Sequence, residues 1–276
     1  MSFHLHNRPA FLKRSYSQLR SMSSIVFVLA IGIQSVAAAQ TAEEAWAKLR
    51  GAERKVTGVY QLPERDPKLP YVFIYGDSIS IHYTPTVREV LAGKANVYRF
   101  YGNGNHSGRF IPAMTKMHTA MRDENVEGHW DFKWDVIHLN VGIHDLKYVR
   151  NKQMNPPAQY EKNLRAIFDF LEKTEPDTKI IFASTTPLPP GGVSYCKPGD
   201  SAVYNEVVKK VLKDYPKVIL NDLYALTKPN PDWYRKPADV HFGKEACHKQ
   251  GEQVATRIRE ALNYRKSQTA NETAKP

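Results

Sequence analysis

Residues 71–78, Tyr-Val-Phe-Ile-Tyr-Gly-Asp-Ser, join a short apolar run to an abrupt polar end. A run of Val, Ile and aromatic residues is typical of a buried β-strand, and Gly76 permits a tight turn into a following helix. Ser78 at such a junction exposes its hydroxyl at a sheet edge, where unpaired N–H groups and the positive end of the helix dipole gather. These groups would stabilise a negative tetrahedral intermediate if the serine acted as a nucleophile. On this stretch alone, Ser78 could equally be a helix cap.

Strands and helices alternate along the rest of the chain. We expect strands at about 70–75, 96–101, 134–140, 178–184 and 217–221, and helices at about 85–93, 111–126, 157–171, 200–212 and 244–262. This alternation predicts an α/β fold, a three-layer αβα sandwich around a flavodoxin-like, mostly parallel five-stranded sheet. Ligands bind such sheets beyond the C-terminal ends of the strands. Ser78 follows one of these ends.

The first 39 residues are typical of a secretory signal peptide. A basic stretch without acidic residues precedes an apolar run at 25–33 and a small-residue stretch at 37–40. The apolar run is short for a membrane span. We therefore expect export to the periplasm or the cell exterior, with no stable membrane insertion after cleavage. An uncleaved membrane anchor is the alternative, and translation could begin at Met22.

The remaining residues suit one domain of ordinary size. We expect an N-terminal lead-in and linker at 40–69, with a short helix capped by Thr41, followed by the domain itself at 70–264. Residues 265–276 are polar and predict a disordered tail.

The charge balance of the chain is basic. Lys and Arg number 39 against 28 Asp and Glu. Without residues 1–39, which hold four basic residues and no acidic one, 35 basic residues face 28 acidic ones, a formal net charge of +7. No basic cluster with interleaved aromatics forms a nucleic-acid motif, so we expect no nucleic-acid partner. A polyanionic or acylated carbohydrate suits an exported protein of this charge better.

Two later segments carry further polar residues. Gly142-Ile-His-Asp145 follows the third expected strand, and Pro237-Ala-Asp-Val-His-Phe242 precedes the last expected helix. Together with Gly76-Asp-Ser78 they resemble the blocks of the SGNH (GDSL-type) hydrolase family of esterases and lipases, over roughly residues 70–262. A Gly-x-His-Asp block in place of Gly-x-Asn-Asp resembles a secreted bacterial subgroup of that family.

The resemblance implies a serine esterase. Ser78 would attack the acyl carbon, His241 would take the hydroxyl proton, and Asp239 would orient the imidazole. The spacing departs from the family, because Asp239 stands two residues before His241 where the family has three.

The resemblance also implies an oxyanion hole. Its donors would be the Ser78 N–H, a backbone N–H in the Gly-rich run 102–108, and His144. Gly104 is the first candidate in the run and Gly108 the second. His144 replaces the family's Asn, and an imidazole N–H can also donate.

Several residues flank these motifs. His82, Asn103 and Arg109 are candidate substrate contacts, although each could simply be solvated or shape a turn. Asp77 is expected to brace the nucleophile turn, and Asp145 to fix the His144 loop.

The expected reaction is hydrolysis of an acyl ester, on a carbohydrate or a small lipid. Transfer of the acyl group to a sugar hydroxyl would use the same three residues. A non-catalytic carbohydrate-binding protein on the same fold is the alternative from another class. No HExxH-type spacing is present, and we expect neither a metal nor another cofactor.

The chain has two cysteines, Cys196 and Cys247. Both are expected near the active-site edge of the sheet, so an exported chain could pair them in a disulfide. Two separate thiols are the alternative.

Overall fold

A five-stranded parallel sheet forms the centre of the computed structural model, which describes residues 39–51 and 58–273. The strand order is β2-β1-β3-β6-β7, so the order reverses beside β1. The strands are β1 (Tyr71–Gly76), β2 (Asn96–Arg99), β3 (Val136–Asn140), β6 (Lys179–Ala183) and β7 (Ile219–Asn221). The prediction of a flavodoxin-like αβα sandwich is confirmed. The place where the strand order reverses is where such sheets bind ligands.

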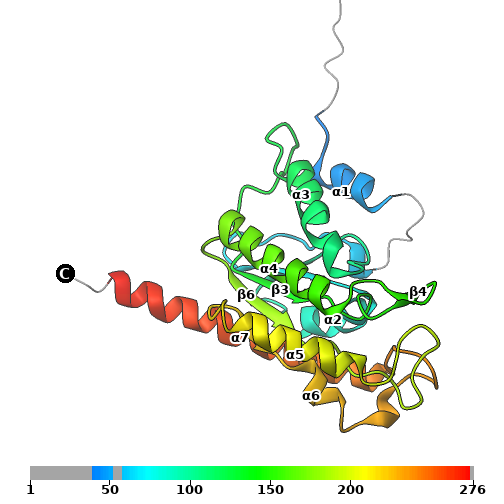
Figure 1. The fold of residues 1–276 in the computed structure, drawn as a ribbon. Helices are drawn as coiled ribbons and strands as arrows, with labels where there is room; N and C mark the ends of the chain where they lie inside the picture. The colour runs from blue at the N-terminus through cyan, green and yellow to red at the C-terminus, as the bar shows by residue number, and fades with distance from the viewer. Residues whose placement is uncertain (1–38, 52–57, 274–276) are drawn as a thin grey trace, which may run out of the picture. The chain divides into compact units, whose positions relative to one another are not determined.

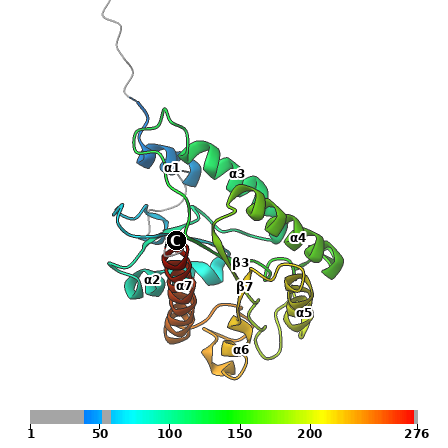
Figure 2. The same ribbon diagram turned by 90° about the vertical axis from the view of Figure 1, so that its left-hand side faces the viewer.

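Helices cover both faces of the sheet (Figures 1 and 2). One face carries α2 (Ser78–Val90), α6 (Leu223–Thr227) and α7 (Lys244–Thr273), and the other carries α3 (Phe110–Met121), α4 (Pro157–Thr174) and α5 (Asp200–Leu212). Side chains of β1 alternate between the two layers. Phe73 and Tyr75 join the α3–α5 core, while Val72 and Ile74 join the α2–α7 core. A strand buried on both sides has no polar face, which explains the continuous apolar run.

Helix α2 begins at the turn that Gly76 was expected to form. It starts at Ser78, ahead of the range 85–93 in which the sequence placed a helix, and contains Pro85. Asp77 makes this start stable, because its carboxylate accepts a hydrogen bond from the Ile79 N–H at 2.9 Å. Ser78 therefore occupies the first helical position.

The last helix is longer than predicted. Helix α7 continues to Thr273, whereas the sequence placed the end of this helix near residue 262 and a disordered tail from residue 265. Residues 265–273 contain no Pro or Gly, so nothing in their backbone chemistry ends the helix. The last three residues of the expected tail and the expected signal peptide, except for Ala39, lie outside the described residues. Among the described residues, no helix has both the length and the apolar character needed to cross a membrane.

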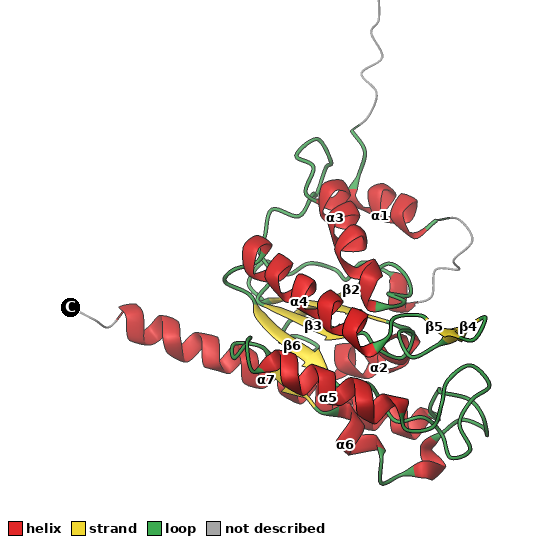
Figure 3. Cartoon of the chain, viewed as in Figure 1, coloured by secondary structure: helices red, strands yellow, loops and turns green. Residues whose placement is uncertain are grey.

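Several short elements had no clear sequence signal (Figure 3). The antiparallel pair β4 (Tyr148–Val149) and β5 (Lys152–Gln153) lies between β3 and α4. Its two-residue strands are too short for a pattern of alternation. The 3₁₀ helices are η1 (Gly58–Tyr60), η2 (Ser107–Arg109) and η3 (Pro231–Trp233).

The lead-in packs onto the domain. Helix α1 (Ala42–Arg50) starts with the predicted Thr41 cap, a capping box with Glu44. Trp46 of α1 contacts the rings of Tyr101 and Trp130 and donates its indole N–H to the Tyr60 carbonyl at 2.7 Å. The segment thus shares the α3–α5 core.

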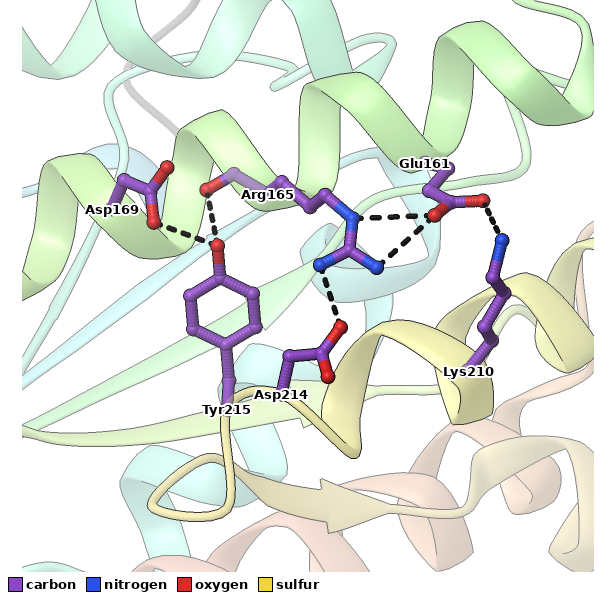
Figure 4. Close-up of polar contacts among 6 residues, drawn as sticks. All are labelled: Glu161, Arg165, Asp169, Lys210, Asp214 and Tyr215. Carbon is purple, nitrogen blue, oxygen red and sulfur yellow. Dashed lines mark hydrogen bonds and ion pairs between the residues drawn. The ribbon is translucent and has the colours of Figure 1, made fainter.

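Charged side chains join α4 to α5 and to the turn after it (Figure 4). Arg165 of α4 contacts Glu161 at 3.1 Å and Asp214 at 2.8 Å, and Lys210 contacts Glu161 at 2.8 Å. Tyr215 donates to Asp169 at 2.6 Å. These contacts fix the outer layer rather than the site.

Candidate active site

Ser78 and His241 lie 163 positions apart in sequence and share a hydrogen bond. Ser78 Oγ is 2.8 Å from His241 Nε2. Ser78 stands at the end of β1, and His241 stands in the loop before α7. The loop is held by a bond from the Arg235 N–H to the His241 carbonyl at 2.9 Å and by a bridge between Tyr234 and Phe242. The structure therefore brings together the serine and histidine that the sequence singled out.

Asp239 completes the arrangement. Its Oδ1 lies 2.6 Å from His241 Nδ1, and its Oδ2 accepts from Arg235 at 2.6 and 3.1 Å. Burial opposes ionisation of this carboxyl, but hydrogen bonds from Arg235 and His241 outweigh it and hold the pKa of Asp239 well below its usual value. An ionised carboxylate beside Nδ1 keeps the proton on that nitrogen. Nε2 is then free to accept the Ser78 hydroxyl proton.

The turn before Ser78 is buried. Asp77 is 1% exposed and braces the turn, as predicted, by capping helix α2, a role for which the sequence had offered Ser78. Burial raises the pKa of Asp77 to about 7, against the lowering effect of the Ile79 N–H.

Behind the turn lies Arg99, the last residue of β2, also 1% exposed. Arg99 was not among the residues singled out from the sequence, and its only signal there was a charged side chain within an expected strand.

In the Gly-rich loop, Gly104 does not have the free backbone N–H that was expected of an oxyanion donor. The Gly104 N–H donates to the Gly76 carbonyl at 2.8 Å, and the Gly104 carbonyl accepts from Tyr75 at 3.0 Å. An N–H used in this way cannot also bind an oxyanion, so the prediction for Gly104 is not met. Within the described part of the chain, the second candidate, Gly108, has an N–H without an acceptor.

Asp145 ties three loops together. It accepts from the Ser107 hydroxyl at 2.6 Å, from the Ser107 N–H at 2.9 Å and from Asn155 at 2.6 Å. Asn163 of α4 donates in turn to the Ser107 hydroxyl at 2.8 Å. Burial raises the pKa of Asp145, against the hydrogen bonds from Ser107 and Asn155. Asp145 therefore fixes the loop of His144, as expected, through partners that the sequence did not reveal.

His144 follows β3 and lies close enough to His241 for their charges to interact. Burial, then the charges of Lys147, His106 and His241, lower the pKa of His144 to about 4. Its ring is therefore neutral at neutral pH. Among the residues that the structure describes, the ring has no hydrogen-bond partner, which leaves a ring N–H available.

Of the three candidate substrate contacts, His82 is the one seen beside the base. Its ring packs edge-on against the His241 ring, with 5.2 Å between centroids. Burial, then His241 and Arg235, lower the pKa of His82. Asn103 instead shapes the loop by accepting from the Asn105 N–H at 2.9 Å. Arg109 ends η2 and is exposed.

The predicted disulfide is not formed. Cys196 and Cys247 are both free. Cys196 is buried in the α3–α5 core, whereas Cys247 of α7 packs on the opposite layer and points its thiol at the Phe242 carbonyl, 3.5 Å away. The two layers separate them. Burial raises the pKa of the Cys196 thiol to about 11.

The described residues contain no group of three or more His, Cys, Asp or Glu arranged to hold a metal ion.

Solved structures of other proteins share the fold, among them three esterases or acylhydrolases. A lipase/acylhydrolase from Enterococcus faecalis is 15% identical, with a TM-score of 0.54, covering 70% of this chain and 96% of that one. The acetyl xylan esterase AlAXEase is 18% identical, with a TM-score of 0.53, covering 68% and 99%. A carbohydrate esterase family 2 enzyme with a carbohydrate binding domain, from Corynascus thermopiles, is 16% identical, with a TM-score of 0.50, covering 72% and 68%. At these identities the likeness is one of fold.

The family model for GDSL-like lipases and acylhydrolases matches residues 74–247. A search of curated proteins finds no match. The matched range is more than half of the chain and contains Ser78, Asp239 and His241. The chain therefore belongs to the GDSL-like lipase/acylhydrolase family and is a serine hydrolase of acyl esters.

Proposed function

We propose that this protein is an exported esterase that cleaves a small acyl ester on a carbohydrate, with Ser78 as nucleophile, His241 as general base and Asp239 as its orienting carboxylate. The observation that carries the proposal is the unbroken chain of contacts from Ser78 Oγ to His241 at 2.8 Å and from His241 to Asp239 at 2.6 Å.

In the first half of the reaction, Ser78 Oγ bonds to the acyl carbon while its proton moves to His241 Nε2. The carbonyl oxygen becomes negative. His241 then gives the proton to the leaving alcohol oxygen as the bond between the acyl carbon and that oxygen breaks. In the second half, water repeats the attack with His241 as base, and Ser78 recovers its proton as the acid leaves.

The negative oxygen needs donors. The Ser78 N–H stands at the first position of α2, where no intrahelical acceptor exists. The Gly108 N–H and the neutral ring of His144 supply the second and third donors. The loops that carry Gly108 and His144 are joined before substrate arrives by the bonds between Ser107 and Asp145, which favours strong stabilisation of the transition state.

Three observations support a carbohydrate substrate: the exposure of His241, the cations beside the site, and the names of proteins with the same fold. The His241 side chain is 25% exposed, so a bulky alcohol can approach the base. The cations Lys147 and Arg235 adjoin the site, since their charges lower the pKa of His144 and of His82. Two of the structures with the same fold are carbohydrate-active by name, an acetyl xylan esterase and a carbohydrate esterase family 2 enzyme.

A serine-directed fluorophosphonate probe tests the nucleophile. It should label the wild-type protein at Ser78 and leave Ser78→Ala unlabelled. Esters of increasing acyl length, followed by acetylated neutral and anionic polysaccharides, then test the substrate. Fastest turnover of long-chain esters, or equal labelling of Ser78→Ala, would contradict the proposal.

A further inference from the structure

Arg99 is a buried cation directly behind the nucleophile turn. It is 1% exposed and ends β2, next to β1 in the sheet. Its guanidinium donates to five oxygens, all of them backbone carbonyls or a hydroxyl: Phe100 O at 2.7 Å, Gly102 O at 2.7 Å, Gly76 O at 3.2 Å, Asp77 O at 3.3 Å and Ser80 Oγ at 3.0 Å. Its Nε has no partner among the described residues.

These acceptors belong to the two walls of the site. One guanidinium nitrogen holds Gly76, Asp77 and Ser80, which surround the nucleophile. The other holds Phe100 and Gly102, at the entry to the Gly-rich loop. A single rigid, planar group thus sets the distance between the nucleophile and the loop that carries the second oxyanion donor.

The charge of Arg99 is not neutralised by direct contact. Every acceptor that it binds is uncharged, and a buried charge without a counterion costs several kcal/mol unless dipoles compensate it. Burial lowers the pKa of Arg99 to about 10, so the group is still protonated at neutral pH. A protein that keeps such a charge beside a site of developing negative charge gains from it in the transition state.

The lead-in covers the outer side of this cation. Arg99 Cζ lies 5.4 Å from the centre of the Tyr60 ring, and Trp46 of α1 holds the Tyr60 carbonyl. An aromatic face attracts a cation and keeps water from it.

We propose that Arg99 is a positioning residue of the ester hydrolysis: it clamps the nucleophile turn to the Gly-rich loop and supplies a fixed positive charge to the negative tetrahedral intermediate. This inference rests on the proposed function of Ser78.

Arg88 of α2 offers a matched control. It too donates to three carbonyls, Val97 O at 3.1 Å, Gly58 O at 2.6 Å and Gln61 O at 3.2 Å, but none of them belongs to the nucleophile turn or to the Gly-rich loop. Arg88→Met and Arg99→Met therefore each remove a guanidinium that braces the backbone. The two variants differ in where the lost guanidinium lies relative to the active site.

The experiment measures kcat, KM, phosphonate labelling rate and thermal unfolding for both variants. Arg99→Met should lower kcat and the labelling rate by about 10²-fold, the scale of one lost oxyanion donor, with KM within about threefold of wild type. Arg88→Met should keep kcat within about threefold of wild type even where it loses thermal stability. Equal kcat values for the two variants would overturn the inference.

Milder changes cover the case in which Arg99→Met does not fold. Arg99→Lys keeps the positive charge but loses the planar guanidinium that reaches several acceptors at once. This variant should retain more activity than Arg99→Met and less than wild type. Tyr60→Ala exposes the guanidinium and should lower kcat, whereas Tyr60→Phe should not. Wild-type kcat in both Arg99→Lys and Tyr60→Ala, in a protein whose Ser78→Ala variant is inactive, would remove Arg99 from the reaction and leave Ser78 in place. A wild-type protein without esterase activity or labelling would instead remove the proposed function.

Discussion

The carboxylate of Asp239 contacts His241 twice. Oδ1 accepts from the backbone N–H of His241 at 3.1 Å and lies 2.6 Å from Nδ1 of its ring. The spacing of two residues permits this double contact, and Ala238, directly before Asp239, adopts a left-handed backbone conformation with φ 55°. The shorter spacing is therefore compatible with an orienting carboxylate.

Asp239→Asn should lower kcat by about 10³–10⁴-fold, because an amide donor beside Nδ1 favours the wrong tautomer of His241. The control is Arg235→Met. The Arg235 side chain is 55% exposed although that of Asp239 is 9% exposed, so solvent screens the pair on one side and its loss should lower kcat by about fivefold at most. Steady-state kinetics on one ester checks both, and equal losses would show that Asp239 acts only through its ion pair.

His144→Ala should lower kcat/KM by about 10²–10³-fold, the cost of one lost oxyanion donor. His144→Asn should keep most of the activity, since an amide N–H can donate in the same place. Because the pKa of His144 is lowered to about 4, the acid limb of the pH–rate profile should be the same in wild type and His144→Asn. Wild-type rates in His144→Ala would place the donor elsewhere.

The cysteines should be two thiols. Alkylation of the unreduced, denatured protein is expected to add two adducts, one on Cys196 and one on Cys247, because the two lie in opposite layers. Thermal unfolding should be unchanged by reductant. A protein that takes up adducts only after reduction would contradict the structure.

Acid should destabilise the fold through buried histidines. Burial lowers the pKa of His138 from 6.5 to about 3, and of His118 likewise. Below pH 6.5 the unfolded chain takes up protons that these folded rings do not, so stability falls as the pH falls. The raised pKa of Asp77 acts in the opposite sense, since its contribution to stability falls as the pH rises toward 7.

His138→Gln isolates this effect. Its ring lies 3.1 Å from the Asn221 amide, which a glutamine can also meet. The denaturant midpoint of His138→Gln should depend less steeply on pH between about 3 and 6.5 than that of wild type. His248→Gln, at a side chain that is 49% exposed, is the control and should leave the slope unchanged. Parallel slopes for all three proteins would rule out His138 as a source of acid sensitivity.

The sequence by itself determined the fold class and the three residues of the proposed chemistry. Apolar strands such as 71–75 can be recognised because both their faces are buried, and Ser78 and His241 stand in motifs that follow a strand or precede a helix. Thr41 was recognised as a cap because capping depends only on residues within one turn.

Only the tertiary structure decided which backbone donors are free and that the two cysteines lie apart. The Gly104 N–H is occupied by Gly76, a residue 28 positions earlier, and the layers of the sheet separate Cys196 from Cys247. The position of Arg99 behind the nucleophile turn was likewise evident only from the tertiary structure. A charged residue in a strand shows its role only when carbonyls from separate loops converge on it, and such convergence depends on packing rather than on local sequence.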